Sequence, residues 1–147
     1  MPATPDSGTA PRTPVAAAPE TLLGFDFGLK KIGVALGNTL TGQARPLCIL
    51  RPVTRQQRFE QVAGLLQAWQ PERVIVGLPL TLTGDEQPAS AHSRRFARQL
   101  EGRFRVPVEL VDERGSSLEA QHILGTHADD DAVAAAVILQ RWLDRAC

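Results

Sequence analysis

Four acidic side chains stand where a carboxylate could do chemistry. Asp26 lies mid-strand between two phenylalanines, where an unpaired charge would be costly. Asp112 and Glu113 end a second strand-like stretch, and Asp131 opens an apolar helical pattern. Converging carboxylates repel one another unless a divalent ion with oxygen ligands, Mg²⁺ or Mn²⁺, lies among them. Two such ions can activate water for in-line attack on a phosphodiester, so the pattern indicates metal-dependent hydrolysis.

Each acid also has a purely structural interpretation. Asp26 could bond to a neighbouring turn, and Asp112 with Glu113 could be an ordinary polar strand end. Asp131 could cap the last helix, although it shares the inward stripe with Ala135 and Ile138. The pattern leaves open whether Asp112 or Glu113 is the ligand.

Candidate substrate contacts flank these acids. Gly28 and Lys30 lie in a hairpin-like segment directly after Asp26, where a glycine allows a phosphate close to the backbone. Arg94 and Arg98 lie on one exposed helical face and could contact phosphates, although exposed helices are commonly charged. The sequence has neither a Walker loop nor a GxGxxG turn that opens a helix, so those nucleotide-binding folds are set aside.

The elements that must position these groups follow from local patterns. Apolar and β-branched runs predict five strands, over residues 22–28, 31–37, 44–50, 73–77 and 106–111. Caps and helical spacing predict four helices, over residues 54–70, from about 90, 116–125 and 130–144. Tight turns join the first three strands and helices join the rest. We therefore expect an α/β fold with a mixed five-stranded sheet, three strands antiparallel and then two parallel, with helices on both faces.

Composition narrows the class of protein. Residues 1–20 hold five of the 11 prolines and predict a disordered tail, which leaves residues 21–147 as the folded domain. The 16 basic and 16 acidic residues balance, which argues against a passive polyanion binder. The longest fully apolar run, residues 132–139, is too short for a membrane span. Two isolated cysteines give no disulfide framework, so we expect a cytoplasmic protein.

Five short motifs in register resemble the YqgF/RuvX family. They are Phe25-Asp26-Phe27-Gly28, Ile32-Gly33-Val34-Ala35, Val76-Gly77-Leu78-Pro79, Asp112-Glu113-Arg114, and Asp131 leading into Ala134-Ala135. The resemblance implies an RNase H-like fold and a cytoplasmic nuclease that uses Mg²⁺ or Mn²⁺. It implies that Asp26, Glu113 and Asp131 are the catalytic and metal-binding residues.

We therefore predict an endonuclease that hydrolyses RNA, in processing of the 16S rRNA precursor. Arg114, Ser116 and Ser117 are expected to contact phosphates, and the products to carry 3′-hydroxyl and 5′-phosphate ends. We expect nucleic acid as the partner and no association with a membrane. We expect the protein to be a monomer or a homodimer. One alternative is a Holliday junction resolvase acting on four-way DNA, which must be a dimer to cut two strands. Two others are a non-catalytic protein that binds nucleic acid or a ribosome or transcription factor, and an ATP-handling module.

Overall fold

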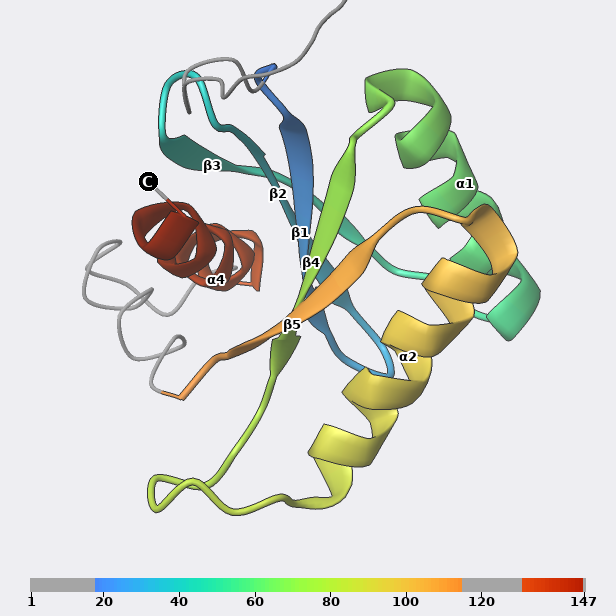
Figure 1. Cartoon of the computed structure of the whole chain (residues 1–147). Helices are drawn as coiled ribbons and strands as arrows, with labels where there is room; N and C mark the ends of the chain where they lie inside the picture. The colour runs from blue at the N-terminus through green and yellow to red at the C-terminus, as the bar shows by residue number, and fades with distance from the viewer. Residues whose placement is uncertain (1–17, 115–130, 147) are drawn as a thin grey trace, which may run out of the picture.

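The computed structural model describes residues 18–114 and 131–146. The elements follow in the order β1 (Thr21–Phe27), β2 (Ile32–Asn38), β3 (Gln43–Leu50), α1 (Arg55–Trp69), β4 (Arg73–Leu78), α2 (Pro88–Phe104), β5 (Val108–Asp112) and α4 (Asp131–Ala146) (Figure 1). Most of the expected tail and the whole of the expected helix over residues 116–125 lie outside these described ranges. Glu20, assigned to the tail from sequence, is bonded to the fold through the backbone and side chain of Thr39.

The five strands form one sheet in the order β3-β2-β1-β4-β5. The pairs β1–β2 and β2–β3 are antiparallel, whereas β1–β4 and β4–β5 are parallel. The predicted mixed sheet is therefore confirmed. Its physical origin is the length of the connections, because short turns allow only antiparallel neighbours and helical crossovers return the chain in parallel. The strand that carries Asp26 is the central one.

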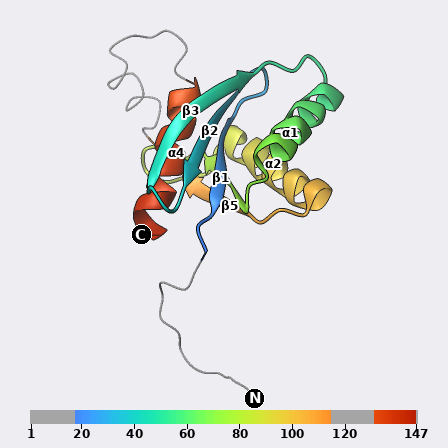
Figure 2. The same ribbon diagram turned by 90° about the horizontal axis from the view of Figure 1, so that it is seen from above.

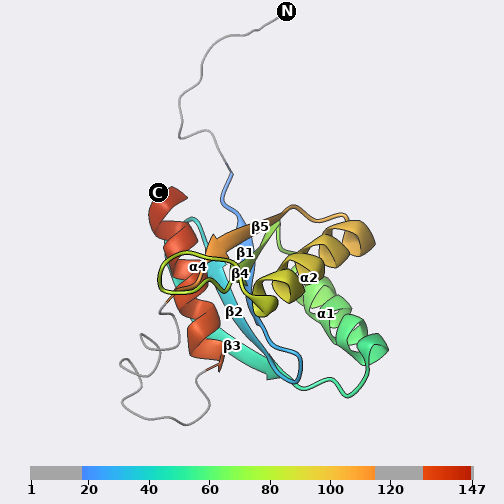
Figure 3. The ribbon, with the colours of Figure 1, turned by 90° about the horizontal axis from the view of Figure 1, so that it is seen from below.

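Helices cover both faces of the sheet. Figures 2 and 3 show α4 on one side and α1 with α2 on the other. Side chains alternate along β1, so Leu23 and Phe25 enter the core under α1 and α2 while Leu22 enters the core under α4. The first of these cores includes Phe96 of α2, whose ring meets that of Phe25 edge-on at 5.8 Å.

Local signals set the ends of α1. The Thr54 hydroxyl accepts a hydrogen bond from the Gln57 amide (3.1 Å), as the predicted cap requires. The Gln57 side chain in turn accepts one from the amide of Val53 (2.8 Å). The helix ends where Gln70 adopts a left-handed conformation (φ 45°) before Pro71. None of the helices in residues 18–114 and 131–146 has the length and apolar composition needed to cross a bilayer.

Candidate active site

Strand alternation places Asp26 on the α4 side of the sheet. Leu22 and Gly24, four and two positions earlier in β1, both lie against α4. Asp26 pairs directly with Gly33 of β2, and residues opposite each other in an antiparallel pair face the same side. A Cβ atom at Gly33 would clash with the backbone carbonyl of Asp131 at the start of α4. The first turn of α4 therefore lies directly against the strand pair that carries Asp26.

Glu113 reaches the same side from the end of β5. Its amide donates to the carbonyl of Leu78 (3.1 Å), which extends the β4–β5 ladder by one residue. Glu109 bonds the Trp142 indole of α4 (3.1 Å), so by alternation the Glu113 side chain also lies on the α4 face. Gly77 makes room for it, because a Cβ there would stand 2.8 Å from Glu113 Oε1.

Asp26 and Glu113 form a hydrogen-bonded pair of carboxyl groups. Burial, above all, and then the Asp26 charge and the hydrogen bond to Asp26 raise the pKa of Glu113 from its usual 4.5 to about 9. Near neutral pH the pair therefore holds one proton between its two carboxyl groups. Such a pair at the carboxyl ends of the strands is poised to bind a cation, since a cation removes the repulsion that the proton now relieves.

Asp112, the other carboxylate at this strand end, is engaged elsewhere. It faces the opposite way from Glu113 and bonds the guanidinium of Arg114, with Oδ2 at 2.8 Å from Nε and 2.7 Å from Nη2. The bond from Arg114 holds the pKa of Asp112 below its usual value. Of the two acids that the sequence left open as ligands, Glu113 and not Asp112 contacts Asp26, and which of them binds a metal stays a prediction.

Asp131 lies close to this pair but pairs with a different group. Its Oδ2 atom is 2.9 Å from the ammonium of Lys31, in the β1–β2 turn. The alignment is that of an ion pair without a hydrogen bond, and Oδ2 is buried and accepts none from the described residues. Within those residues, no three Asp, Glu, His or Cys side chains are assembled into a metal site. The meeting of all three carboxylates stays a prediction.

Two cations near the site were missed by the sequence reasoning. Lys31 is one, and Arg141 of α4 is the other. Arg141 donates to the carbonyls of Asp112 (2.9 Å) and Arg114 (2.8 Å), which fixes the end of β5 to α4. Its charge also opposes the rise in the pKa of Glu113. The available signal was an arginine one turn after Ile138 in a largely apolar helix.

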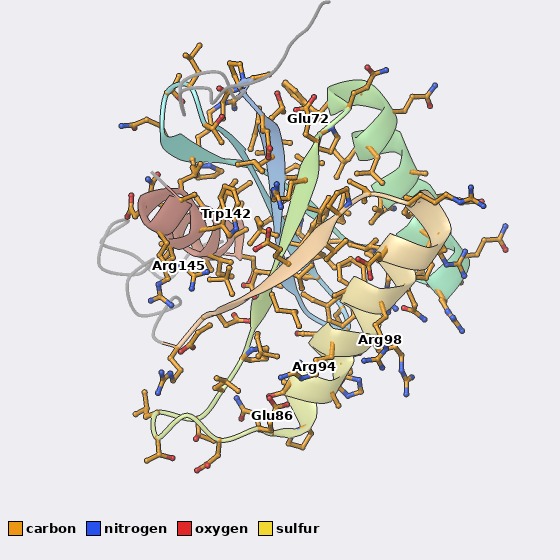
Figure 4. The ribbon with its side chains drawn as sticks, viewed as in Figure 1. Glu72, Glu86, Arg94, Arg98, Trp142 and Arg145 are labelled. Carbon is orange, nitrogen blue, oxygen red and sulfur yellow. The ribbon has the colours of Figure 1, made fainter. Side chains whose placement is uncertain are left out.

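The predicted substrate contacts are divided between two places. Gly28 and exposed Lys30 follow Asp26 in the β1–β2 turn, and Arg114 lies two residues beyond β5, where its Nη1 donates to the carbonyl of Leu82 (3.3 Å). Arg94 and Arg98 lie on α2, across the sheet from the carboxyl pair (Figure 4). There Arg94 is already paired with Glu86 (Nη2–Oε2 2.7 Å). The other two predicted contacts, Ser116 and Ser117, lie outside the described residues.

The mixed sheet, with a carboxylate on its central strand and an acid just after β5, has the RNase H-like fold. Solved structures with this fold include Thermus thermophilus RuvC, with a TM-score of 0.54 and 15% identity over 86% of this chain and 95% of that one. The Holliday junction resolvase of fowlpox virus has a TM-score of 0.58 and 15% identity over 86% and 99%. At such identities the likeness establishes the fold.

Sequence similarity establishes the family. The chain belongs to the RuvX family, described as "Holliday junction resolvase", whose model matches residues 20–145. A relative from Bordetella parapertussis, described as "Putative pre-16S rRNA nuclease", is 72% identical over 125 residues, which cover 85% of this chain and 94% of the relative. A relative from Cupriavidus taiwanensis with the same description is 51% identical over 85% and 89%. The resemblance noted from the motifs is thus confirmed.

Proposed function

We propose that this chain is a divalent-metal-dependent endonuclease that hydrolyses phosphodiester bonds in RNA, with the 16S rRNA precursor as its substrate. The observation that carries the proposal is the contact between Asp26 and Glu113, two carboxyl groups held together at the carboxyl edge of the sheet. The description of the relatives from Bordetella and Cupriavidus supports the choice of substrate. A cytoplasmic location goes with that substrate.

The donor groups fit Mg²⁺ or Mn²⁺. Both ions prefer carboxylate oxygens, and the Oδ2 atom of Asp131, which faces the Lys31 ammonium, is shielded from solvent. In the proposed site Asp26, Glu113 and Asp131 would hold the ions. Bound there, the metal supplies a Lewis acid that activates water and stabilises charge on the leaving oxygen.

The remaining roles belong to the chain itself. The Glu113 carboxyl gives up its proton when it becomes a ligand, so binding of the ions is expected to release protons. Lys30 and Arg114, on either side of the carboxyl pair, are exposed cations that can orient a phosphate. Arg141 keeps the end of β5 against α4 and so keeps Glu113 beside Asp26.

A second candidate keeps this chemistry and changes the substrate to four-way DNA. The observation in its favour is the description of the family that matches this chain. Symmetrical cleavage of two strands needs two sites, so this function requires a stable dimer.

The test incubates purified protein and Mg²⁺ or Mn²⁺ with a 16S rRNA precursor fragment, an unrelated RNA of equal length, linear DNA and a four-way junction. We expect cleavage of the precursor fragment, and no cleavage by Asp26→Asn or Glu113→Gln. The matched control is Glu101→Gln, because Glu101 is exposed on α2, across the sheet. Cleavage that survives the change at Asp26 contradicts the proposed site. Preferential cleavage of the junction by a dimer supports the second candidate instead.

A further inference from the structure

Two arginines lie over one aromatic ring, that of Phe59, on the side of the sheet away from α4. The guanidinium carbon of Arg103, near the end of α2, lies 4.0 Å from the centre of the Phe59 ring, and that of Arg55, the first residue of α1, lies 6.0 Å from it. The side chains of both arginines line an open hollow of about 510 Å³ between α1 and α2. We call this hollow the α1–α2 groove.

Two arginines, one in the groove and one beside it, are placed where a positive charge destabilises the folded protein. The first turn of α1 has no acid and instead begins with Arg55, although the positive end of a helix disfavours cations. Arg58, one turn later, has a buried Nε without a hydrogen-bond acceptor among the described residues. Burial, and then the nearby charge of Arg55, lower its pKa. A bound anion would relieve each of these costs.

Acids of the fold do not neutralise the groove. Glu60 lies in its wall and accepts a hydrogen bond from Gln56 (3.2 Å). Across residues 18–114 and 131–146, no ion pair joins Arg55, Arg58 or Arg103 to an acid. This differs from the outer face of α2, where Arg94 is paired with Glu86. The groove therefore keeps an excess of positive charge beside an aromatic ring.

The groove approaches the carboxyl pair around the end of β1. Arg58 lies over the ring of Phe27, with its guanidinium carbon 5.1 Å from the ring centre. Phe27 directly follows Asp26, and the two side chains leave the strand on opposite faces. A chain of phosphates that passes Asp26 therefore needs only to cross the β1–β2 turn, which carries Lys30, to reach Arg58 and the groove.

We propose that the α1–α2 groove binds the sugar-phosphate backbone of single-stranded RNA flanking the bond to be cut. Arg55 and Arg103 contact successive phosphates, and Arg58 holds the strand where it crosses from the carboxyl pair. The charge of the groove complements a polyanion, and a strand held at Asp26 can reach the groove across the β1–β2 turn. This inference rests on the proposed function, because it extends the same substrate beyond the reacting bond.

The test measures RNA binding in an Asp26→Asn background, so that cleavage does not interfere. The probe is a fluorescein-labelled single-stranded RNA of about 20 nucleotides, longer than the ~4–16 that a single-strand-binding domain covers. Arg55→Gln/Arg103→Gln is compared with Arg45→Gln/Arg145→Gln, which removes the same charge from β3 and α4. Anisotropy titrations between about 50 and 200 mM salt give the slope of log K against log[salt].

We expect the groove variant to bind more weakly and its salt slope to be smaller by about 1.4, at ~0.7 for each of two lost single-strand phosphate contacts. The control variant should keep the slope. Thermal melting should show that the groove variant still folds, because Arg55→Gln removes an unfavourable cation from the start of α1 while Arg103→Gln removes a favourable one from the end of α2. If the double variant does not fold, Arg55→Gln alone should lower the slope by about 0.7.

Equal slopes for the groove and control variants would overturn the inference and leave the proposed function standing. So would a loss confined to duplex DNA of the same sequence. A protein that cuts no RNA would contradict the proposed function, and the binding assay would still report on the groove. Binding of the RNA with the expected loss in the groove variant alone supports the inference.

Discussion

Replacing Glu113 by Gln should stabilise the metal-free protein while abolishing its activity. In the wild type the carboxyl pair must hold a proton, because burial and the charge of Asp26 disfavour ionisation of Glu113. Glutamine has nearly the same shape and no charge, and its amide can donate to Asp26. The cost of keeping two carboxyl groups together therefore disappears, and with it one of the groups that must bind the metal.

The size of the effect follows from the pH dependence. The pKa of Glu113 is about 9 in the folded protein against 4.5 for a free carboxyl. Between these values the folded state keeps a proton that the unfolded state has lost, so stability is full below pH 4.5 and falls as pH rises towards 9. One proton corresponds to about 1.4 kcal/mol per pH unit. From pH 6 to pH 8 the wild type should lose about 2.7 kcal/mol relative to Glu113→Gln.

Urea unfolding followed by tryptophan fluorescence, at pH 6 and pH 8 with a chelator present, measures this difference. Glu101→Gln serves as the control, because its exposed carboxylate lies across the sheet from the pair. A difference between wild type and Glu113→Gln that is the same at both pH values would refute the shared proton. It would mean that both carboxyl groups are ionised in the folded protein.

Further predictions concern the neighbours of the pair. Mg²⁺ at a hundredfold excess over its Kd should stabilise the wild type by about 2.7 kcal/mol in thermal melts but leave Glu113→Gln unchanged, and equal stabilisation would contradict the site. Gly77→Ala should cost about 1–3 kcal/mol in urea unfolding and lower activity, since its Cβ would stand 2.6 Å from Ile138 Cδ1. Gly64→Ala, which meets no atom within 4 Å in a helix, should instead be stabilising by ~0.5–1 kcal/mol; similar losses at both glycines would count against this packing. Arg141→Gln should lower the free energy of unfolding by about 1–3 kcal/mol and raise the pKa of the carboxyl pair. A pH dependence of stability equal to that of the wild type would contradict this role of Arg141.

The order of the elements was predictable because its signals are local. The alternation around Asp26 marks a strand in any context, and Thr54 with Gln57 caps a helix through atoms three residues apart. The lengths of the connections then dictated which strands are parallel. For the same reason the sequence could place Asp26, a strand-end acid and Asp131 on three elements that reach the same region of the sheet.

Partners across the fold were not predictable. Glu86 and Arg94 are joined because a loop returns to the start of α2, and Lys31 meets Asp131 because α4 packs on Gly33. Such pairs depend on the angle and distance at which helices meet the sheet. The periodicity of apolar residues does not determine that angle or that distance. The sequence analysis therefore predicted a phosphate contact for Arg94 and missed its bond to an acid.

The carboxyl pair separates what the sequence determines from what the tertiary structure decides. The amino-acid sequence by itself determined that the central strand carries an inward carboxylate and that an acid ends β5. Only the tertiary structure decided which acid meets Asp26, because the β4–β5 register and the absent side chain of Gly77 direct Glu113 inward. It also decided that the pair shares a proton, since a pKa depends on burial and on charges brought together from distant parts of the chain.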